Sequence, residues 1–169
     1  EITLTDFLTI QNTGTLNATN GTDGDSTITL GGNWTNSGTF TADTSTVILN
    51  GSNQQINGST TFNNLTKEVT ASDTLTFEAG TTQTITGTTT LKGQNGAPLT
   101  LLSSASPAIW NIDPQGPRDI DYVRVQDSTN LNALVIDPPN SSDLGNTTNW
   151  FSFAPTFTWT GATSTDWGT

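Results

Sequence analysis

The feature that most constrains this chain is a short phrase that returns along it. Gly14-Thr15-Leu16-Asn17-Ala18 is echoed by Gly38-Thr39-Phe40-Thr41-Ala42. A second phrase, Thr27-Ile28-Thr29-Leu30, is echoed by Thr46-Val47-Ile48-Leu49. The copies are spaced by roughly 14 to 24 residues, near the periods of solenoid coils. The repeat therefore predicts a chain that winds through a series of similar turns. Looser copies follow further along the chain, at 60–62, 74–77 and 88–91.

Within each copy, apolar residues alternate with threonine or asparagine, as in Leu75-Thr76-Phe77. Such alternation places one face of a strand in a core and the other in water. Each stretch is too short to form a core alone, so we expect equivalent strands to stack into one apolar column. An antiparallel β-sandwich is the alternative, because it satisfies the same alternation. The residues expected to point inward are Leu16, Ile28, Leu30, Phe40, Val47, Leu49, Phe62, Leu65, Leu75, Phe77, Leu91, Leu101, Ile112, Val123, Val125 and Val135.

The composition favours strands and turns over helices. Threonine is β-branched and favours strands, whereas asparagine and glycine accept the backbone angles of tight turns. The hydrophobic content is only 31%, but the charged content is also low, at 11%, which is not typical of a disordered chain. No window carries apolar residues at helical spacing. The composition therefore predicts an all-β chain of many short strands.

The pattern changes in the second half of the chain, where the strands become more apolar and less repetitive. Prolines separate these strands, and proline marks turns in preference to central strands. We expect a β-solenoid over residues 1–150, with irregular C-terminal strands, and an aromatic tail or connecting strand over residues 151–169. The tail contains an alternating stretch at 156–160, in which Phe157 and Trp159 are the expected interface anchors.

Three longer phrases carry a resemblance: GNWTNSGTF at 32–40, TFNNL at 61–65 and DYVRVQDS at 121–128. They resemble parallel β-helix segments of very large secreted bacterial surface proteins. The resemblance implies a right-handed parallel β-helix and a role in adhesion or surface architecture. It implies no catalytic residues, because none are shared across such proteins.

The charge balance excludes two classes of partner. The net charge is −11, and the four basic residues are Lys67, Lys92, Arg118 and Arg124. A chain so acidic lacks the surface that binds phosphate backbones, so no nucleic-acid partner is expected. No apolar run approaches the roughly 20 residues that span a bilayer, so no membrane insertion is expected. Cysteine, methionine and histidine are absent, and the lack of easily oxidised residues favours an extracellular or cell-surface location.

The chain is not expected to be an enzyme. Without histidine and cysteine it cannot use the usual nucleophile–base pairs or Cys/His zinc sites. The densest acidic cluster is Asp119, Asp121 and Asp127, and polysaccharide-cleaving enzymes use paired carboxylates. We interpret the cluster as a solvated strand face on which aspartate pairs with Arg118 and Arg124.

One loop is a candidate for Ca²⁺, and no other cofactor is expected. Asp23 and Asp25 lie in a glycine-bent loop that supplies hard oxygen ligands, although an ordinary turn has the same composition. The chain also contains Asn-x-Ser/Thr sequons, which accept sugar only in a host that makes N-glycans. The candidate glycosylation sites are Asn17, Asn20, Asn33, Asn50, Asn57, Asn64, Asn140 and Asn146.

The leading hypothesis for function is a non-catalytic structural module of an extracellular filament, sheath or surface adhesin. A solenoid has two ends with unpaired strand edges, so we expect a homo-oligomer or filament built through end-to-end strand contacts. The alternative is a surface module that binds glycans through tryptophan and aspartate. A polysaccharide lyase or glycosidase ranks third.

Overall fold

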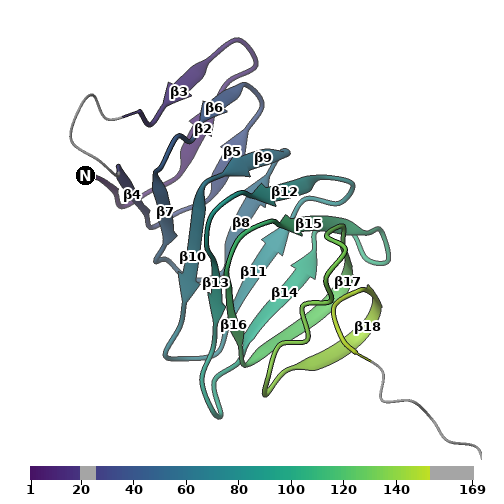
Figure 1. The fold of residues 1–169 in the computed structure, drawn as a ribbon. Coiled ribbons are helices and arrows are strands. Elements are labelled where there is room, and N and C mark those ends of the chain that lie inside the picture. Colours follow the sequence, from purple (N-terminus) through teal and green to yellow (C-terminus); the bar gives the residue numbers. More distant parts are fainter. Residues whose placement is uncertain (20–25, 153–169) are drawn as a thin grey trace, which may run out of the picture.

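The computed structural model describes residues 1–19 and 26–152, which form an all-β solenoid (Figure 1). None of these residues forms a helix long and apolar enough to cross a membrane. The strands in chain order are β1 (Ile2–Leu4), β2 (Leu8–Ile10), β3 (Thr15–Asn17), β4 (Thr27–Leu30), β5 (Trp34–Asn36), β6 (Thr39–Thr41), β7 (Thr46–Leu49), β8 (Gln54–Asn57), β9 (Thr60–Phe62), β10 (Asn64–Glu68), β11 (Asp73–Phe77), β12 (Thr82–Ile85), β13 (Thr89–Lys92), β14 (Leu99–Ser103), β15 (Trp110–Pro114), β16 (Arg118–Asp121), β17 (Val123–Asn130) and β18 (Ser142–Thr148).

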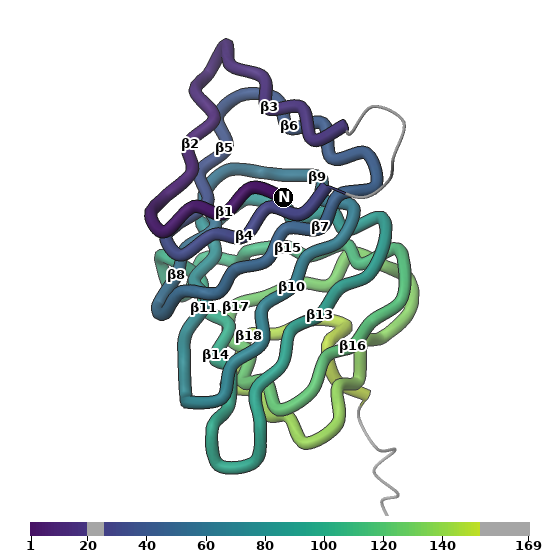
Figure 2. Tube along the Cα trace, turned by 90° about the vertical axis from the view of Figure 1, so that its left-hand side faces the viewer, coloured from purple at the N-terminus to yellow at the C-terminus, as the bar shows by residue number. Residues whose placement is uncertain are grey.

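Every third strand stacks on the same face of the solenoid. The first face contains β1, β4, β7, β10, β13 and β16, and the second contains β2, β5, β8, β11, β14 and β17. The third face contains β3 and β6 in one sheet and β9, β12 and β15 in another. All pairs between these named strands are parallel, and the chain winds from face to face around the axis (Figure 2). This topology confirms the parallel β-helix and excludes the antiparallel sandwich.

The coils are longer and less regular than the sequence repeat indicates. Along the first face, Ile2 lies beside Ile28, Ile28 beside Val47 and Val47 beside Leu65, which gives coils of 26, 19 and 18 residues. The next two coils have 24 and 29 residues. The spacing of 14 to 24 residues is wrong because the looser copies are not equivalent. They fall in β9, β11 and β13, which lie on three different faces.

The core follows the predicted alternation closely. Thirteen of the sixteen residues expected to point inward are buried, and Leu16 and Phe40 are half-buried against the same core. Trp34 is fully buried and contacts Phe40 edge-on, with ring centroids 4.9 Å apart. Stacked alternating strands therefore form one apolar column along the axis, as expected.

Val135 is the exception and is 41% exposed. The segment around it was expected to be a strand, but it is a loop between β17 and β18. The guanidinium of Arg118 donates hydrogen bonds to the carbonyls of Leu134 and Val135. These carbonyls therefore bind a side chain instead of a neighbouring strand, and Ile136 packs on the core in place of Val135.

The last coil is irregular, as predicted. β17 is eight residues long and pairs with β14 at its beginning and with β15 at its end, so it covers two faces. β18 pairs with β17, and the register shifts between Val125 and Gln126. Asp127 adopts a φ of 53° close to this shift. The irregularity is therefore a bend that carries one long strand around a corner.

Candidate functional site

The N-terminal end of the solenoid is open. β1, β2 and β3 each pair with the following coil on one edge, and no strand of residues 1–19 or 26–152 pairs with the other edge. These strands lie at the purple end of the ribbon in Figure 1. An unpaired parallel edge presents backbone N–H and C=O groups that favour the addition of another strand.

Apolar side chains are exposed at this same end. Ile2 is 50% exposed and Phe7 is 62% exposed. A hollow of about 350 Å³ opens between β2 and β3, and its apolar lining includes Leu8, Ile10 and Leu16. These residues belong to the inward column, so the hollow is the core seen end-on. The open end therefore combines hydrogen-bonding edges with an uncovered apolar interior.

The C-terminal end is closed, which corrects the expectation of two open ends. Trp150 is fully buried, lies edge-on to Trp110 at 6.0 Å, and donates an indole hydrogen bond of 2.7 Å to Ser128 Oγ. The backbone N–H of Asp137 donates to the carbonyl of Trp150 at 2.8 Å. Phe151 packs on the core beside it. Trp150 and the loop after β17 therefore cap the core at this end.

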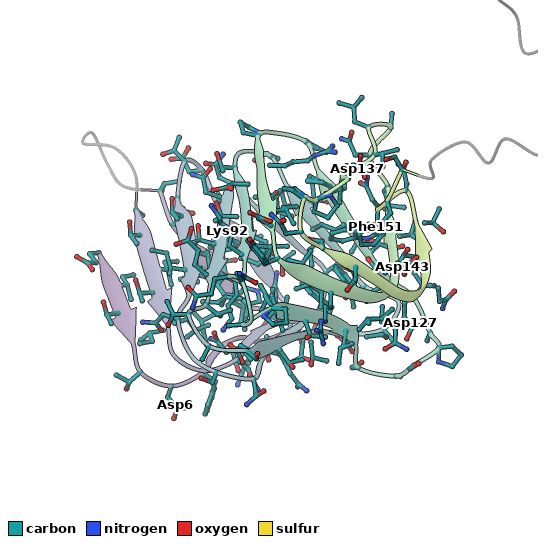
Figure 3. The ribbon with its side chains drawn as sticks, turned by 90° about the horizontal axis from the view of Figure 1, so that it is seen from below. Asp6, Lys92, Asp127, Asp137, Asp143 and Phe151 are labelled. Atoms are coloured by element: carbon teal, nitrogen blue, oxygen red, sulfur yellow. The ribbon has the colours of Figure 1, made fainter. Side chains whose placement is uncertain are left out.

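A hydrogen-bonded carboxylate fastens the cap. Both the backbone N–H and the hydroxyl of Ser152 donate to Asp137, at 3.1 and 2.6 Å. These hydrogen bonds lower the pKa of the Asp137 carboxyl below its ordinary value. Figure 3 shows Asp137 and Phe151 near one another at this end, far from Asp6 at the other.

Four predicted site residues lie outside the described residues. They are the Ca²⁺ candidates Asp23 and Asp25 and the interface anchors Phe157 and Trp159. Within residues 1–19 and 26–152, no group of three or more histidine, cysteine, aspartate or glutamate side chains is arranged to hold a metal ion.

The predicted glycosylation sites divide by what their amide groups bind. Asn17 and Asn50 are exposed, and their amide nitrogens donate no hydrogen bond to a described residue. Asn33 is half-buried and accepts a hydrogen bond from the Gln55 N–H through its oxygen, which leaves its nitrogen free of described partners. The nitrogens of a second group donate to neighbouring residues and would lose those bonds on glycosylation. That group is Asn57, Asn64, Asn140 and Asn146, and Asn20 lies outside the described residues.

The acidic cluster does not converge on one site. Asp119 and Asp121 flank buried Ile120 on β16, as the alternation predicts. Asp119 pairs with Lys92 at 3.0 Å and not with an arginine, which corrects the expected Asp–Arg pairing. Asp127 is buried near the bend of β17, where its Oδ1 accepts a hydrogen bond from Asn146.

A buried ion pair escaped the sequence analysis. Lys67 is fully buried, and its ammonium lies 2.8 Å from Asp73 Oδ2 and 2.9 Å from Gln54 Oε1, with the Gly51 carbonyl as its third acceptor. Burial alone would raise the pKa of Asp73, but hydrogen bonds from Lys67 and from the backbone N–H groups of Asn53 and Thr74 outweigh it. The pKa of Asp73 therefore lies below its ordinary value, and the pair is charged.

Comparison with known proteins adds no relative. No family model, no curated protein and no solved structure matches this chain.

Proposed function

We propose that this chain is a non-catalytic structural module of an extracellular filament, sheath or surface adhesin, and that it assembles head-to-tail. The observation that carries the proposal is the contrast between the two ends. β1, β2 and β3 offer unpaired edges around an apolar hollow, whereas Trp150 and Phe151 cover the other end.

The open end is suited to one further coil of β-strand. A strand added to β1, β2 or β3 gains backbone hydrogen bonds along its length. Covering Leu8, Leu16 and the exposed Ile2 removes apolar surface from water, which is favourable in proportion to the area covered. Both terms act on the same edge, so a coil that satisfies one satisfies the other.

We assign this added strand to the tail of a second copy. The tail continues from Ser152, which lies at the end of the solenoid opposite to β1–β3 (Figure 1). An extended chain spans about 3.3–3.6 Å per residue, so the 17 residues of 153–169 can cross a junction between two copies. Phe157 and Trp159 are the apolar residues that would enter the hollow. A contact of this kind does not close on itself and propagates into a filament.

The composition supports an extracellular location. The chain contains no cysteine or methionine, so it lacks the two residues that oxidants attack most readily. With only four lysine and arginine residues, it also offers few sites to trypsin-like proteases. Stacked strands that share backbone hydrogen bonds along one axis give a stiff rod, which is the property that a fibre or sheath requires.

The assembly is tested by sedimentation velocity and negative-stain electron microscopy of the 169-residue chain. We expect oligomers that lengthen with concentration. Deleting residues 155–169 should leave a folded monomer, as should Phe157→Asp combined with Trp159→Asp. Ile2→Lys and Leu8→Lys should block assembly from the other side, with circular dichroism to verify folding. Ser164→Asp is the matched control, because it adds a charge to the tail outside the alternating stretch.

A mixing experiment identifies the junction directly. The tail-deleted chain retains an open end, and the Leu8→Lys chain retains a tail, so an equimolar mixture should form a one-to-one dimer that does not extend. A full-length chain that stays monomeric at its highest soluble concentration would reject head-to-tail assembly. Filaments that form normally without residues 155–169 would reject the tail as the connector.

A further inference from the structure

Three of the four basic residues are occupied within the protein. Lys67 and Lys92 form ion pairs, and Arg118 donates hydrogen bonds to backbone carbonyls. Arg124 is different. It is exposed on β17, and within residues 1–19 and 26–152 its guanidinium has neither a hydrogen-bond acceptor nor an ion-pair partner. In the described part of this acidic chain, Arg124 is thus the one cationic side chain left available to a ligand.

Arg124 borders a polar cleft of about 280 Å³ at the corner between the first and second faces. The turn between β13 and β14 contributes Gln94 and Asn95 to its lining, and the segment before β18 contributes Asn140. Tyr122 lies on the same wall as Arg124. The cleft is slightly smaller than the roughly 300 Å³ at which pockets for drug-sized ligands begin, so it suits one unit of a longer molecule.

Tyr122 occupies an unusual backbone position. It is the single residue between β16 and β17, and it turns the corner with a φ of 51°. Every other non-glycine residue with positive φ in the described chain is an asparagine or aspartate, the residues that tolerate this conformation best. A bulky side chain kept at a strained position points to a role for that side chain.

The surrounding charge limits the kind of ligand. Asp121 adjoins the cleft, and its Oδ1 accepts hydrogen bonds from the Asn140 amide and from the Tyr122 N–H. The net charge of −11 repels a dense polyanion. A single carboxylate is different, because it can pair with Arg124 while charges beyond a Debye length of about 8 Å are screened.

We infer that this cleft binds an oligosaccharide that carries one carboxylate, such as a uronic acid. Arg124 pairs with the carboxylate, and the apolar ring of Tyr122 lies against the sugar while its hydroxyl stays available for hydrogen bonding. Gln94, Asn95 and Asn140 supply amide groups for the sugar hydroxyls. The site is independent of the head-to-tail assembly, since it lies on the fifth and sixth coils and not at the open end.

The inference is tested by isothermal titration with a disaccharide of glucuronic acid and xylose, against the same disaccharide with glucose in place of glucuronic acid. We expect the acidic disaccharide to bind more tightly. Arg124→Ala should weaken its binding by about tenfold or more, as expected for a lost charge-assisted hydrogen bond. Lys92→Ala removes the same charge outside the cleft and should leave the affinity unchanged.

Tyr122→Asn separates binding from folding. Asparagine suits the positive φ, so this variant should be at least as stable as the parent chain and should still bind the acidic disaccharide more weakly. Equal affinity for the acidic and neutral disaccharides, no binding at millimolar concentration, or full binding by Arg124→Ala would each overturn the inference. Tighter binding of polygalacturonate per uronic acid would overturn the restriction to one carboxylate. A strictly monomeric chain that binds the disaccharide would reject the proposed assembly and uphold the cleft.

Discussion

Phe77 of β11 and Trp110 of β15 stack face to face across the core, with ring centroids 3.7 Å apart and ring planes 5° from parallel. Both residues are fully buried. Phe77 belongs to the second face of the fourth coil, and Trp110 belongs to the third face of the fifth. The pair therefore joins two faces and two coils that share no backbone ladder at this point.

Removing this contact should be costly. Trp110→Ala should lower the free energy of unfolding by about 3–5 kcal/mol, because it deletes a large side chain that the core cannot fill by collapsing. Guanidinium denaturation followed by circular dichroism measures the change. Leu134→Ala, at a residue that is 70% exposed, is the control and should stay within about 0.5 kcal/mol of the parent chain. Equal costs for both variants would contradict the burial of Trp110.

The Lys67–Asp73 pair should behave as a coupled unit. Lys67→Met leaves the Asp73 carboxylate buried without its cation, and breaking a buried pair in this way costs about 3–5 kcal/mol. Lys67→Leu combined with Asp73→Asn should recover most of that loss. Leucine suits a column in which Lys67 is in register with Leu91, and asparagine still offers an oxygen to the N–H groups of Asn53 and Thr74. A double variant as unstable as Lys67→Met would contradict this coupling.

The same pair gives the protein a defined acid sensitivity. The pKa of Asp73 is lower in the folded chain than its ordinary value of 3.8. Its ionised form therefore stabilises the folded state fully above about pH 5, and this contribution is lost as the pH falls through the folded pKa. Unfolding free energies of the parent chain and of Asp73→Asn should differ by a constant amount above about pH 5 and converge below about pH 4. Parallel curves down to pH 3 would contradict the direction of the pKa shift.

A glycine corner should tolerate no side chain. A Cβ atom on Gly51 would lie 1.8 Å from the carbonyl oxygen of Gly31 in the coil beneath, so backbone atoms must move to admit it. Gly51→Ala should cost about 1–3 kcal/mol, as overpacking does elsewhere. Ser52→Ala, at the exposed neighbouring residue, is the control for thermal unfolding. Matching midpoints for the two variants would show that the corner is looser in solution than this contact requires.

The strand faces could be predicted from the sequence because alternation is a local property. Leu16 and Phe40 pair in register, as do Ile28 and Val47, and both pairs come from the two clearest sequence echoes. The coil length could not be predicted in the same way. All three faces of one coil present the same apolar–threonine–apolar pattern, so copies on different faces look equivalent in sequence.

The ion pair and the cleft depend on contacts between distant residues. Alternation places Lys67 on the same side as Leu65, but lysine is almost never fully buried without a partner. Its partner Gln54 lies 13 residues earlier on another strand, and no local pattern links the two. Tyr122 and Arg124 likewise meet Gln94 only because coils of unequal length stack at one corner.

The parallel stacking described above also decides how the molecule responds to pulling. The hydrogen bonds between coils run along the solenoid axis, so a force applied between its ends loads them one row at a time instead of all together. Coils then detach in sequence. Each detached coil of 18 to 29 residues releases roughly 60–100 Å of extended chain. A fibre of such modules would lengthen in steps under load and dissipate work at each step before any covalent bond is strained.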